Sequence, residues 1–327
     1  MAKPNILVTV PTFPMEAVDV LSELADVRVN PHTGMYTKDE LIKEIEDVDV
    51  LVLGNEKFDR EVARTAMRLR MIARFGVGYD NVDIAEATRN RLWVTYTPGA
   101  SSKAVAELTI GLMLSLAKRI PQADHYVRSG KWSEGAVPFP IGSELNGKLL
   151  GIIGLGQIGL EVAERARCFG MATIYFDKVR NFAAEQRLGV TPVNVDELLR
   201  RVDFVAIHVA LTEETKGMIG WREIGLMKNT AFLVNTSRGA VVDQEALYDA
   251  LKEGRIAGAG LDVFSVEPIR RNDPLLSLDN VVLTPHIAAV TAETILNMAS
   301  MVVEDVARFL RGGEPIHTLI RGKSRLV

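Results

Sequence analysis

The sequence predicts an α/β protein with two domains, each a doubly wound parallel sheet covered by helices. Three observations lead to this prediction. Short apolar runs alternate with helical stretches over residues 1–98, the alternation resumes at residue 148, and a glycine-rich turn opens the second series. Such a βαβ rhythm implies parallel strands, because each crossover helix returns the chain to the same edge of the sheet. A chain of 327 residues is long enough for two cores of this kind.

The first series predicts a domain that carries no phosphate-binding glycine motif. Its apolar runs have the length and the β-branched content of short buried strands. The predicted strands are residues 5–10, 27–29, 48–53, 71–75 and 92–97, and the predicted helices are residues 15–24, 37–46, 60–67 and 83–88. Thr37 and Glu40 have the spacing of a capping box, which predicts the start of the second helix.

The middle of the chain predicts a long helix followed by an irregular arm. Residues 97–102 interrupt the alternation, and an amphipathic pattern follows at 103–119, which we expect Pro121 to end. Residues 121–148, including Val137-Pro138-Phe139-Pro140, show little regular pattern. The apolar side chains of such an arm need a surface to cover, and a second subunit and the chain itself are both candidates.

The second series predicts a dinucleotide-binding sheet of the Rossmann type. Its predicted strands are residues 149–153, 172–176, 203–209, 231–235, 258–263 and 281–283, and its predicted helices are residues 157–169, 195–201 and 244–253. A last helix is expected at 291–310, followed by a short basic tail at 321–325 that we expect to be solvated.

The glycine turn has the context that dinucleotide binding requires. Gly154, Gly156 and Gly159 follow an apolar strand and open a helix. Gly154 permits the turn, Gly156 lets a pyrophosphate approach the backbone, and Gly159 lets the helix lie near the strand. The next apolar run ends in Asp177, where a carboxylate would accept the ribose hydroxyls and repel a 2′-phosphate. These residues predict NAD as the cofactor.

Composition and charge narrow the partners and the compartment. A net charge of -4 gives no reason to expect nucleic acid or an anionic membrane as a partner. Cys168 is the single cysteine, so we expect a buried apolar filler there and no metal site. The first residues lack a signal-peptide pattern, and no apolar run is long enough to cross a bilayer. We therefore expect a cytoplasmic protein with a small-molecule substrate.

Polar residues that follow the later strands are the candidates for chemistry. Arg238, Glu267 and His286 each follow a strand of the second series, and Asp262 and His208 lie at strand ends. Ligands bind beyond the carboxyl ends of the strands in open α/β sheets. Taken singly, each of the first three could be a surface or structural residue. Together at one sheet edge, they predict a catalytic set.

This set suits hydride transfer to or from a bound nicotinamide. A histidine can exchange the hydroxyl proton near neutral pH. An arginine can hold a carboxylate and polarise the reacting oxygen. A glutamate bonded to the imidazole would orient it and favour its protonated form. We therefore assign these roles to His286, Arg238 and Glu267, in that order.

The chain resembles the D-isomer-specific 2-hydroxyacid dehydrogenase family over essentially its whole length, because several of its motifs occur in the order found in that family. The matching stretches are Gly76-Val77-Gly78-Tyr79-Asp80-Asn81-Val82-Asp83, Ala106-Glu107-Leu108-Thr109, residues 151–159, residues 235–243, Gly260-Leu261-Asp262-Val263-Phe264 and Pro285-His286. The resemblance implies reversible hydride transfer between NAD(H) and a 2-hydroxy or 2-keto acid. It also implies a flavodoxin-like substrate domain, residues 1–98 and 292–327, and a Rossmann NAD domain, residues 99–291.

The resemblance further implies roles for single residues. Arg238 would bind the substrate carboxylate and carbonyl, and Glu267 would partner His286 as the acid–base group. Val77 and Gly78 would offer backbone N–H groups to the carboxylate. Cofactor contacts would come from Gln157, Ile158, Asp177, His208, Thr236, Arg238, Asp262 and His286. The helix and arm at residues 101–148 would join two chains into a homodimer.

The substrate stays open between two enzyme classes. The chain looks most like phosphoglycerate dehydrogenase, in which Arg74 could neutralise a substrate phosphate. Those enzymes often have a further arginine where this chain has Leu53, and the longer ones carry a regulatory domain for which this chain has no room. Glyoxylate or hydroxypyruvate reduction uses the same catalytic set and is the alternative.

A function of another class also has to be considered. NADH-responsive corepressors, which bind peptide partners, resemble this chain at residues 76–83 and keep the same three catalytic residue types. They often have a histidine within the stretch that reads Ala106-Glu107-Leu108-Thr109 here. This chain has no histidine in that stretch, so an enzyme is the preferred prediction. The likeness to corepressors is one of fold, and a shared fold alone does not decide function.

Overall fold

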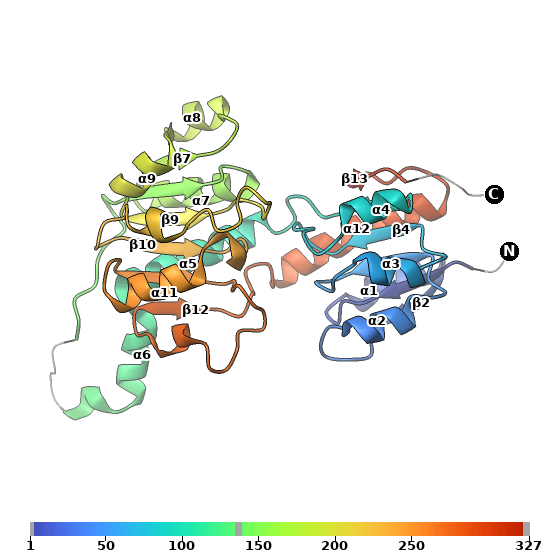
Figure 1. The fold of residues 1–327 in the computed structure, drawn as a ribbon, viewed down its shortest axis with the longest axis horizontal. Helices are drawn as coiled ribbons and strands as arrows, with labels where there is room; N and C mark the ends of the chain where they lie inside the picture. Colours follow the sequence, from blue (N-terminus) through green and yellow to red (C-terminus); the bar gives the residue numbers. More distant parts are fainter. Residues whose placement is uncertain (1–2, 135–138, 323–327) are drawn as a thin grey trace. The chain divides into compact units, whose positions relative to one another are not determined.

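The computed structural model describes residues 3–134 and 139–322. The chain forms two compact units, each with its own sheet of mainly parallel strands (Figure 1). The first unit comprises Met1–Ser101 and Val290–Val327, and the second comprises Ser102–Ala289. The predicted fold class is confirmed. Val137 and Pro138 of the predicted arm, and the tail beyond residue 322, lie outside the described residues.

The sheet of the first unit has the strand order of flavodoxin, with one strand added at an edge. Its strands are β1 (Asn5–Val8), β2 (Asp26–Val29), β3 (Val50–Leu53), β4 (Met71–Arg74), β5 (Trp93–Thr95) and β13 (Thr318–Ile320). They lie in the order β13-β5-β4-β3-β1-β2, and β1 to β5 are parallel. The parallel order 2-1-3-4-5 places a topological switch point between β1 and β3.

The helices of the first unit cover both faces of this sheet. They are α1 (Met15–Ser22), α2 (Lys38–Glu44), α3 (Arg60–Thr65), α4 (Ile84–Arg89) and α12 (Ala292–Leu310). Ile6 and Val8 of β1 pack toward α1 and α12, whereas Leu7 packs toward α2 and α3. A strand buried on both faces has no polar alternation, which explains its continuous apolar sequence. The predicted capping box of α2 is present, with both reciprocal bonds between Thr37 and Glu40.

Strand β13 was not predicted, and a buried carboxylate explains why it forms. It pairs antiparallel with β5, unlike its neighbours. Just before it, Asp305 of α12 accepts hydrogen bonds from the backbone N–H of Ile316 at 2.7 Å and of His317 at 3.2 Å. Its other oxygen lies 3.1 Å from Nδ1 of His317. The pairing of β13 with β5, which lies far earlier in the chain, leaves no pattern in the local sequence.

The sheet of the second unit is wholly parallel in the described part of the chain. Its strands are β6 (Leu149–Ile153), β7 (Ala172–Phe176), β8 (Thr191–Pro192), β9 (Phe204–Ile207), β10 (Phe232–Asn235), β11 (Gly258–Leu261) and β12 (Val281–Leu283). They lie in the order β12-β11-β10-β9-β6-β7-β8. The order reverses between β6 and β9, where dinucleotides bind in doubly wound sheets. The two-residue strand β8 is too short to show a periodicity and was not predicted.

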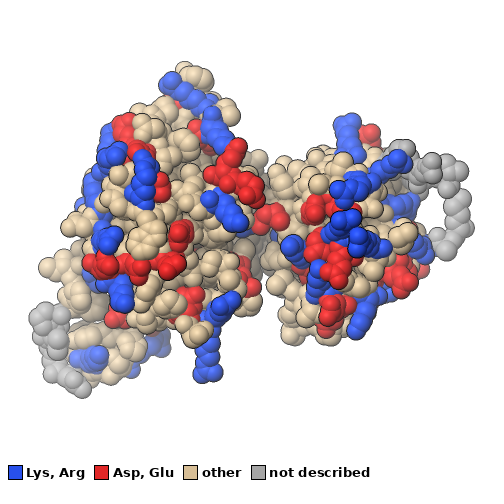
Figure 2. All heavy atoms as spheres, in the orientation of Figure 1, with Lys and Arg blue, Asp and Glu red and all other residues tan. Residues whose placement is uncertain are grey.

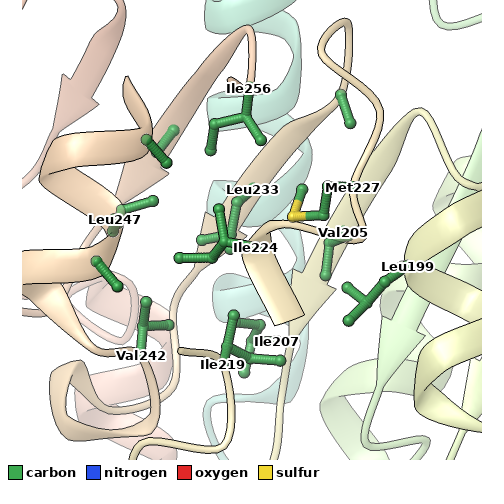
Figure 3. Packing of buried hydrophobic residues seen from close by; sticks show 14 of the residues in the cluster. Leu199, Val205, Ile207, Ile219, Ile224, Met227, Leu233, Val242, Leu247 and Ile256 are labelled. Atoms are coloured by element: carbon green, nitrogen blue, oxygen red, sulfur yellow. The ribbon is translucent and has the colours of Figure 1, made fainter. Parts of the chain in front are cut away.

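Two apolar clusters cover the faces of this second sheet. Its helices are α5 (Ser102–Lys118), α6 (Ile120–Arg128), α7 (Gln157–Cys168), α8 (Phe182–Leu188), α9 (Val195–Arg201), α10 (Trp221–Ile224) and α11 (Gln244–Lys252). α5 and α7 pack together over one face. On the other face, Leu199, Ile224 and Leu247 from three helices meet Val205 and Leu233 of the strands (Figure 3). These cores hold the strand ends, and hence the loops that follow them, in place.

The expectation that Pro121 ends the long helix and opens an irregular stretch is wrong. α5 ends at Lys118, Arg119 adopts a left-handed backbone with φ of 56°, and Pro121 lies in the first turn of a new helix, α6. Proline is compatible with a first helical turn, since the N–H that it lacks has no intrahelical partner there. The proline therefore marks the start of a helix.

Cys168 is exposed and does not fill the core as expected. The buried side of α7 is formed by Gly159, Val162, Ala163 and Ala166, and Cys168 lies outside this stripe at the last position of the helix. Its thiol donates to the backbone carbonyl of Glu164 at 3.5 Å. The helical period, and not residue type, decides the exposure of this side chain.

The surface is charged and mixed in sign. On the face shown in Figure 2, the blue side chains of Lys and Arg are interspersed with the red ones of Asp and Glu. Within residues 3–134 and 139–322, no helix has both the length and the apolar character needed to span a membrane.

Candidate functional site

The glycine turn between β6 and α7 is shaped by two glycines and left open by a third. Gly154 has φ of +97°, and a Cβ added there would lie 2.8 Å from the carbonyl carbon of His208. A Cβ at Gly159 would lie 2.2 Å from the carbonyl oxygen of Gly154. At Gly156, an added Cβ would meet no described atom within 4 Å. Packing thus explains two glycines, and Gly156 leaves space for a ligand beside the backbone.

The N-terminus of α7 offers donors at this open space. Gly156 is the N-cap residue and provides no capping side chain. The first backbone N–H groups of a helix have no intrahelical partners and carry a partial positive charge. Gly156 and Gln157 are exposed, and Ile158 is half-buried. A pyrophosphate fits the donors and the free space found here.

Asp177 connects the turn to the end of β7. Its Oδ2 accepts a hydrogen bond from the backbone N–H of Leu155 at 2.7 Å, and its Oδ1 accepts one from Val179 at 3.2 Å. An ionised carboxylate has about four acceptor positions, so two bonds leave capacity for ribose hydroxyls. The predicted ribose contact is compatible with this geometry.

His208, one residue beyond β9, has a neutral imidazole next to the same turn. Burial lowers the pKa of its side chain to about 3. Neither ring nitrogen has a hydrogen-bond partner among residues 3–134 and 139–322, although both are buried. A buried polar atom without a partner is costly, and a bound ligand can supply the missing bond. This observation also fits a cofactor at the edge of the second sheet.

His286 and Glu267 form a short hydrogen bond. His286 Nδ1 lies 2.6 Å from Glu267 Oε2, and the backbone N–H of Phe264 donates to Glu267 Oε1 at 2.9 Å. Burial by itself raises the pKa of Glu267. The bonds from His286 and Phe264, together with the charges of His286 and Arg238, outweigh burial and lower that pKa below its usual value. The carboxylate is therefore ionised at neutral pH and accepts a hydrogen bond from Nδ1–H of His286.

The remaining ring nitrogen of His286 is available for proton transfer. Nε2 makes no hydrogen bond with the described part of the chain, and the side chain is 35% exposed. With Nδ1–H held by Glu267, a proton can be gained or lost only at Nε2. The structure thus brings together the two residues that the sequence predicts as acid–base pair.

Asp262 holds the backbone that carries His286. Its side chain is wholly buried, and it accepts bonds from the N–H of Ile287 and Ala288, both at 2.9 Å, and from the hydroxyl of Thr284 at 2.6 Å. His286 has φ of 53°, a conformation that costs a residue with a side chain about 1–2 kcal/mol. These bonds show a positioning role for Asp262, and its predicted cofactor contact stays a prediction.

Arg238 lies in the loop after β10, close enough for its charge to act on Glu267. Its Nη1 donates to the carbonyl of Ser237 at 2.8 Å, and its own carbonyl accepts from the side chain of Asn235 at 2.9 Å. Gly239 follows, and a Cβ there would lie 2.0 Å from the carbonyl carbon of Phe264. Glycine is needed because the loops that carry Arg238 and Glu267 touch at this point.

Thr236 is anchored from beneath the same loop. Its hydroxyl lies 2.9 Å from that of Thr109 in α5, which donates to the carbonyl of Val105 at 2.8 Å. Because the hydroxyl proton of Thr109 is donated to that carbonyl, the hydroxyl of Thr236 donates to Thr109. The oxygen of Thr236 can still accept a hydrogen bond. The predicted cofactor contact of Thr236 remains a prediction.

The residues predicted to bind substrate from the first unit lie in the loop after β4. Neither Val77 nor Gly78 donates its backbone N–H to another described residue. Arg74 is buried and donates to the carbonyls of Gly78 at 2.9 Å and of Phe75, and to the side chain of Asn55 at 2.7 Å. Through these bonds, Arg74 stabilises the conformation of this loop.

The sequence prediction missed Gly239 and Gln244. The amide of Gln244 accepts from the N–H of Ser265 at 2.9 Å and donates to Asp273 at 2.9 Å, so it ties the loop of Glu267 to α11. Gly239 lies inside a stretch that resembles the family, and this resemblance could have indicated its importance. Nothing in the local sequence indicates a role for Gln244, because its partners are distant in sequence.

Comparisons with known proteins extend this picture. The family model described as D-isomer specific 2-hydroxyacid dehydrogenase, NAD binding domain, matches residues 110–288. A glyoxylate reductase of Korarchaeum cryptofilum is 46% identical over 315 residues, which cover 96% of this chain and 95% of that protein. A D-3-phosphoglycerate dehydrogenase of Methanocaldococcus jannaschii is 45% identical over 310 residues, 94% of this chain and 58% of that protein.

A solved structure extends the similarity to the whole fold. An NADPH-dependent glyoxylate/hydroxypyruvate reductase of Sinorhizobium meliloti, in complex with NADP and malonate, matches with a TM-score of 0.87. It is 30% identical and covers 100% of both chains. The family model spans more than half of this chain, and the glyoxylate reductase relative matches nearly the full length of this chain. The chain therefore belongs to the D-isomer specific 2-hydroxyacid dehydrogenase family and is an NAD-dependent oxidoreductase that acts on 2-hydroxy acids.

Proposed function

We propose that this protein reduces a small 2-keto acid of the glyoxylate or hydroxypyruvate class, with His286, Glu267 and Arg238 as its catalytic residues. The 2.6 Å bond between His286 and Glu267, beside the charge of Arg238, carries the proposal. A histidine held by an ionised carboxylate suits proton donation to a carbonyl oxygen. An arginine beside it suits a substrate with a carboxylate next to that carbonyl.

Each residue has a defined part in the reaction. Bound NADH supplies the hydride. Arg238 pairs its donors with the substrate carboxylate and carbonyl oxygen, which draws negative charge onto that oxygen. His286 releases the proton of Nε2 to the oxygen as the hydroxyl forms, while Nδ1–H stays bonded to Glu267. The carboxylate thereby keeps the ring oriented and stabilises its protonated form. The reverse reaction uses the same groups, with Nε2 as the proton acceptor.

The contacts of Arg74 favour a substrate without a phosphate. Its described bonds go to three backbone carbonyls and to Asn55, and its side chain is buried. An arginine that binds a substrate phosphate has to direct its N–H donors at the substrate. The named relatives that match over nearly their full length are glyoxylate reductases. Reduction of phosphohydroxypyruvate is the second candidate, since the phosphoglycerate dehydrogenase relative is 45% identical.

A panel of keto acids tests the proposal. NADH oxidation is measured with glyoxylate, hydroxypyruvate, pyruvate and phosphohydroxypyruvate at equal concentrations. We expect the highest kcat/KM with glyoxylate or hydroxypyruvate. A preference for phosphohydroxypyruvate would move the assignment to the phosphorylated substrate. Tight NADH binding without turnover of any keto acid would favour a corepressor-like binding protein instead.

We also propose that the chain acts as a homodimer joined through residues 101–148. Exposed apolar side chains gather in this part of the chain, namely Ile120, Val127, Trp132 and Ile141. None of the residues of α6 is buried within the chain. An amphipathic helix and arm with unburied apolar side chains are typical of a surface that a partner covers.

A further inference from the structure

Two cations follow Asp177 in the loop between β7 and α8. They are Lys178 and Arg180. In dinucleotide-binding sheets, an acidic residue at this place binds the ribose of NAD, and a nearby arginine accommodates the 2′-phosphate of NADP. The loop thus contains a residue type that suits NAD and residue types that suit NADP. Which cofactor it prefers depends on what these cations bind in the free protein.

Both cations are paired with carboxylates, but the two pairs differ in quality. Arg180 donates from Nε and Nη2 to the two oxygens of Glu185, each at 2.8 Å. The side chain of Glu185 is only 14% exposed. Lys178 pairs with Glu214, and their side chains are 64% and 71% exposed. A two-pronged arginine bond has a defined geometry, whereas an exposed lysine pair contributes little and exchanges readily.

Glu185 is anchored from the core of the second unit. The hydroxyl of the buried Tyr175 donates to Glu185 Oε1 at 2.7 Å and accepts the backbone N–H of Asn181 at 2.9 Å. Burial, ahead of the neighbouring carboxylate, raises the pKa of Tyr175, so its hydroxyl stays protonated and donates. The bonds from Arg180, in the first place, lower the pKa of Glu185, so it stays ionised. The bond from Tyr175 therefore restrains the carboxylate from following Arg180 if the guanidinium turns elsewhere.

Arg180 is held on its other side as well. The central carbon of its guanidinium lies 4.6 Å from the centre of the Phe182 ring, a cation–π arrangement. Phe182 is the first residue of α8, and Glu185 lies one turn further on the same helix. Helix α8 thus contacts Arg180 in two ways. The ring of Phe182 packs on the face of the guanidinium, and the carboxylate of Glu185 binds its N–H edge.

We propose that Glu185 determines cofactor preference by holding Arg180 away from the ribose site, so that a 2′-phosphate finds no arginine to neutralise it. The inference rests on the NAD-dependent function described above and on Asp177 lying at the ribose. Discrimination against NADP then has two parts. Asp177 repels the phosphate, and Glu185 withholds the cation that would compensate for the repulsion. Glu185 is a specificity-determining positioning residue and does not touch the cofactor.

The test replaces Glu185 with glutamine, which keeps the size of the side chain and an acceptor for Tyr175. Dissociation constants for NADH and NADPH are measured by fluorescence, beside kcat/KM for both cofactors. We expect the affinity for NADPH relative to NADH to rise roughly tenfold, the effect of gaining one charge-assisted hydrogen bond. Adding Arg180→Met should cancel this rise, because the freed guanidinium is its cause.

Two further variants complete the design. Glu214→Gln is the matched control, and we expect a smaller change of the ratio, since Lys178 already exchanges freely. Tyr175→Phe removes the anchor of Glu185 without changing its charge, and we expect a smaller rise in the same direction. This variant also tests the inference if Glu185→Gln does not fold, as judged by its melting temperature.

Two results would overturn the inference. One is an unchanged ratio in a folded Glu185→Gln or Tyr175→Phe protein. The other is a rise that survives Arg180→Met or that Glu214→Gln equals. Either failure leaves NADH binding and keto-acid reduction by the unaltered protein intact. If the unaltered protein does not bind NADH, the underlying function fails instead, and the inference with it.

Discussion

At the scale of single residues, His286 combines an unfavourable backbone with the side chain that we propose as the proton donor. Its left-handed conformation is maintained by the bonds that Asp262 accepts from the next two residues. Strained backbone that the surroundings hold in place is typical of functional sites. Here the imidazole bonds to Glu267 through Nδ1, and Nε2 makes no hydrogen bond with the described residues.

The first prediction concerns His286→Asn. Asparagine tolerates the left-handed conformation but cannot transfer a proton near neutral pH. We expect kcat to fall by roughly 10²- to 10⁴-fold, the usual contribution of general acid–base catalysis. NADH should still bind, because the glycine turn and Asp177 supply most of the expected cofactor contacts. Near-normal turnover in this variant would exclude His286 as the proton donor.

The second prediction concerns Glu267→Gln and pH. The pKa of Glu267 is lowered in the folded protein, so its ionisation stabilises the fold. That contribution is complete above the unfolded pKa near 4.5 and is lost as the pH falls through the lower folded pKa. Denaturant unfolding between about pH 3 and 7 should therefore show a shallower loss of stability toward acid in the variant. An identical slope in both proteins would contradict the assigned ion pair.

The same variant should also change the reaction. Without the carboxylate, the imidazole loses the hydrogen bond that orients it, so we expect kcat for keto-acid reduction to fall. An unchanged kcat in a folded Glu267→Gln protein would contradict this role of Glu267.

At the scale of elements, the turn between β6 and α7 separates packing from binding within one motif. Gly159→Ala places a methyl group 2.2 Å from the carbonyl of Gly154, so α7 must move away from the turn. We expect a loss of several kcal/mol of stability, as for other overpacked sites, or failure to fold.

Gly156→Ala is the matched control, since the new methyl group meets no described atom within 4 Å. We expect a stability loss of only about 1 kcal/mol, from a poorer N-cap. NADH affinity should nevertheless fall at least tenfold, because the methyl group occupies the side of the turn that faces the ligand. Thermal melting and NADH titration measure the two effects. Unchanged affinity in Gly156→Ala would remove this glycine from the binding site.

At the scale of the whole molecule, the exposed apolar side chains of the arm predict an association that disappears when they become charged. Trp132→Asp should shift the protein from dimer to monomer in light scattering, because a buried unpaired charge is strongly unfavourable. Trp221→Asp changes another exposed tryptophan, on α10, and should leave the mass unchanged. A monomeric unaltered protein would refute the dimer directly.

The sequence predicted most strands because apolar runs and turns are local signals. The bounds of β6, β7 and β12 agree with the prediction, and those of most other strands differ by one or two residues at either end. The helix α6 was missed because proline was taken as an end, although it is equally compatible with a first turn. Strand β8 was missed because two residues show no periodicity, and β13 was missed because its partner β5 lies far away in the sequence.

By itself, the sequence determined the fold class, the glycine turn and the residue types of the candidate site, because periodicity, glycine spacing and strand ends are properties of a linear chain. Only the tertiary structure decided which side chains face one another. It pairs His286 with Glu267, uses Asp262 to hold a loop, binds Arg74 to carbonyls and ties Arg180 to Glu185. Side-chain hydrogen bonds depend on distances of a few tenths of an ångström between remote segments, and such distances exist only once the cores have packed.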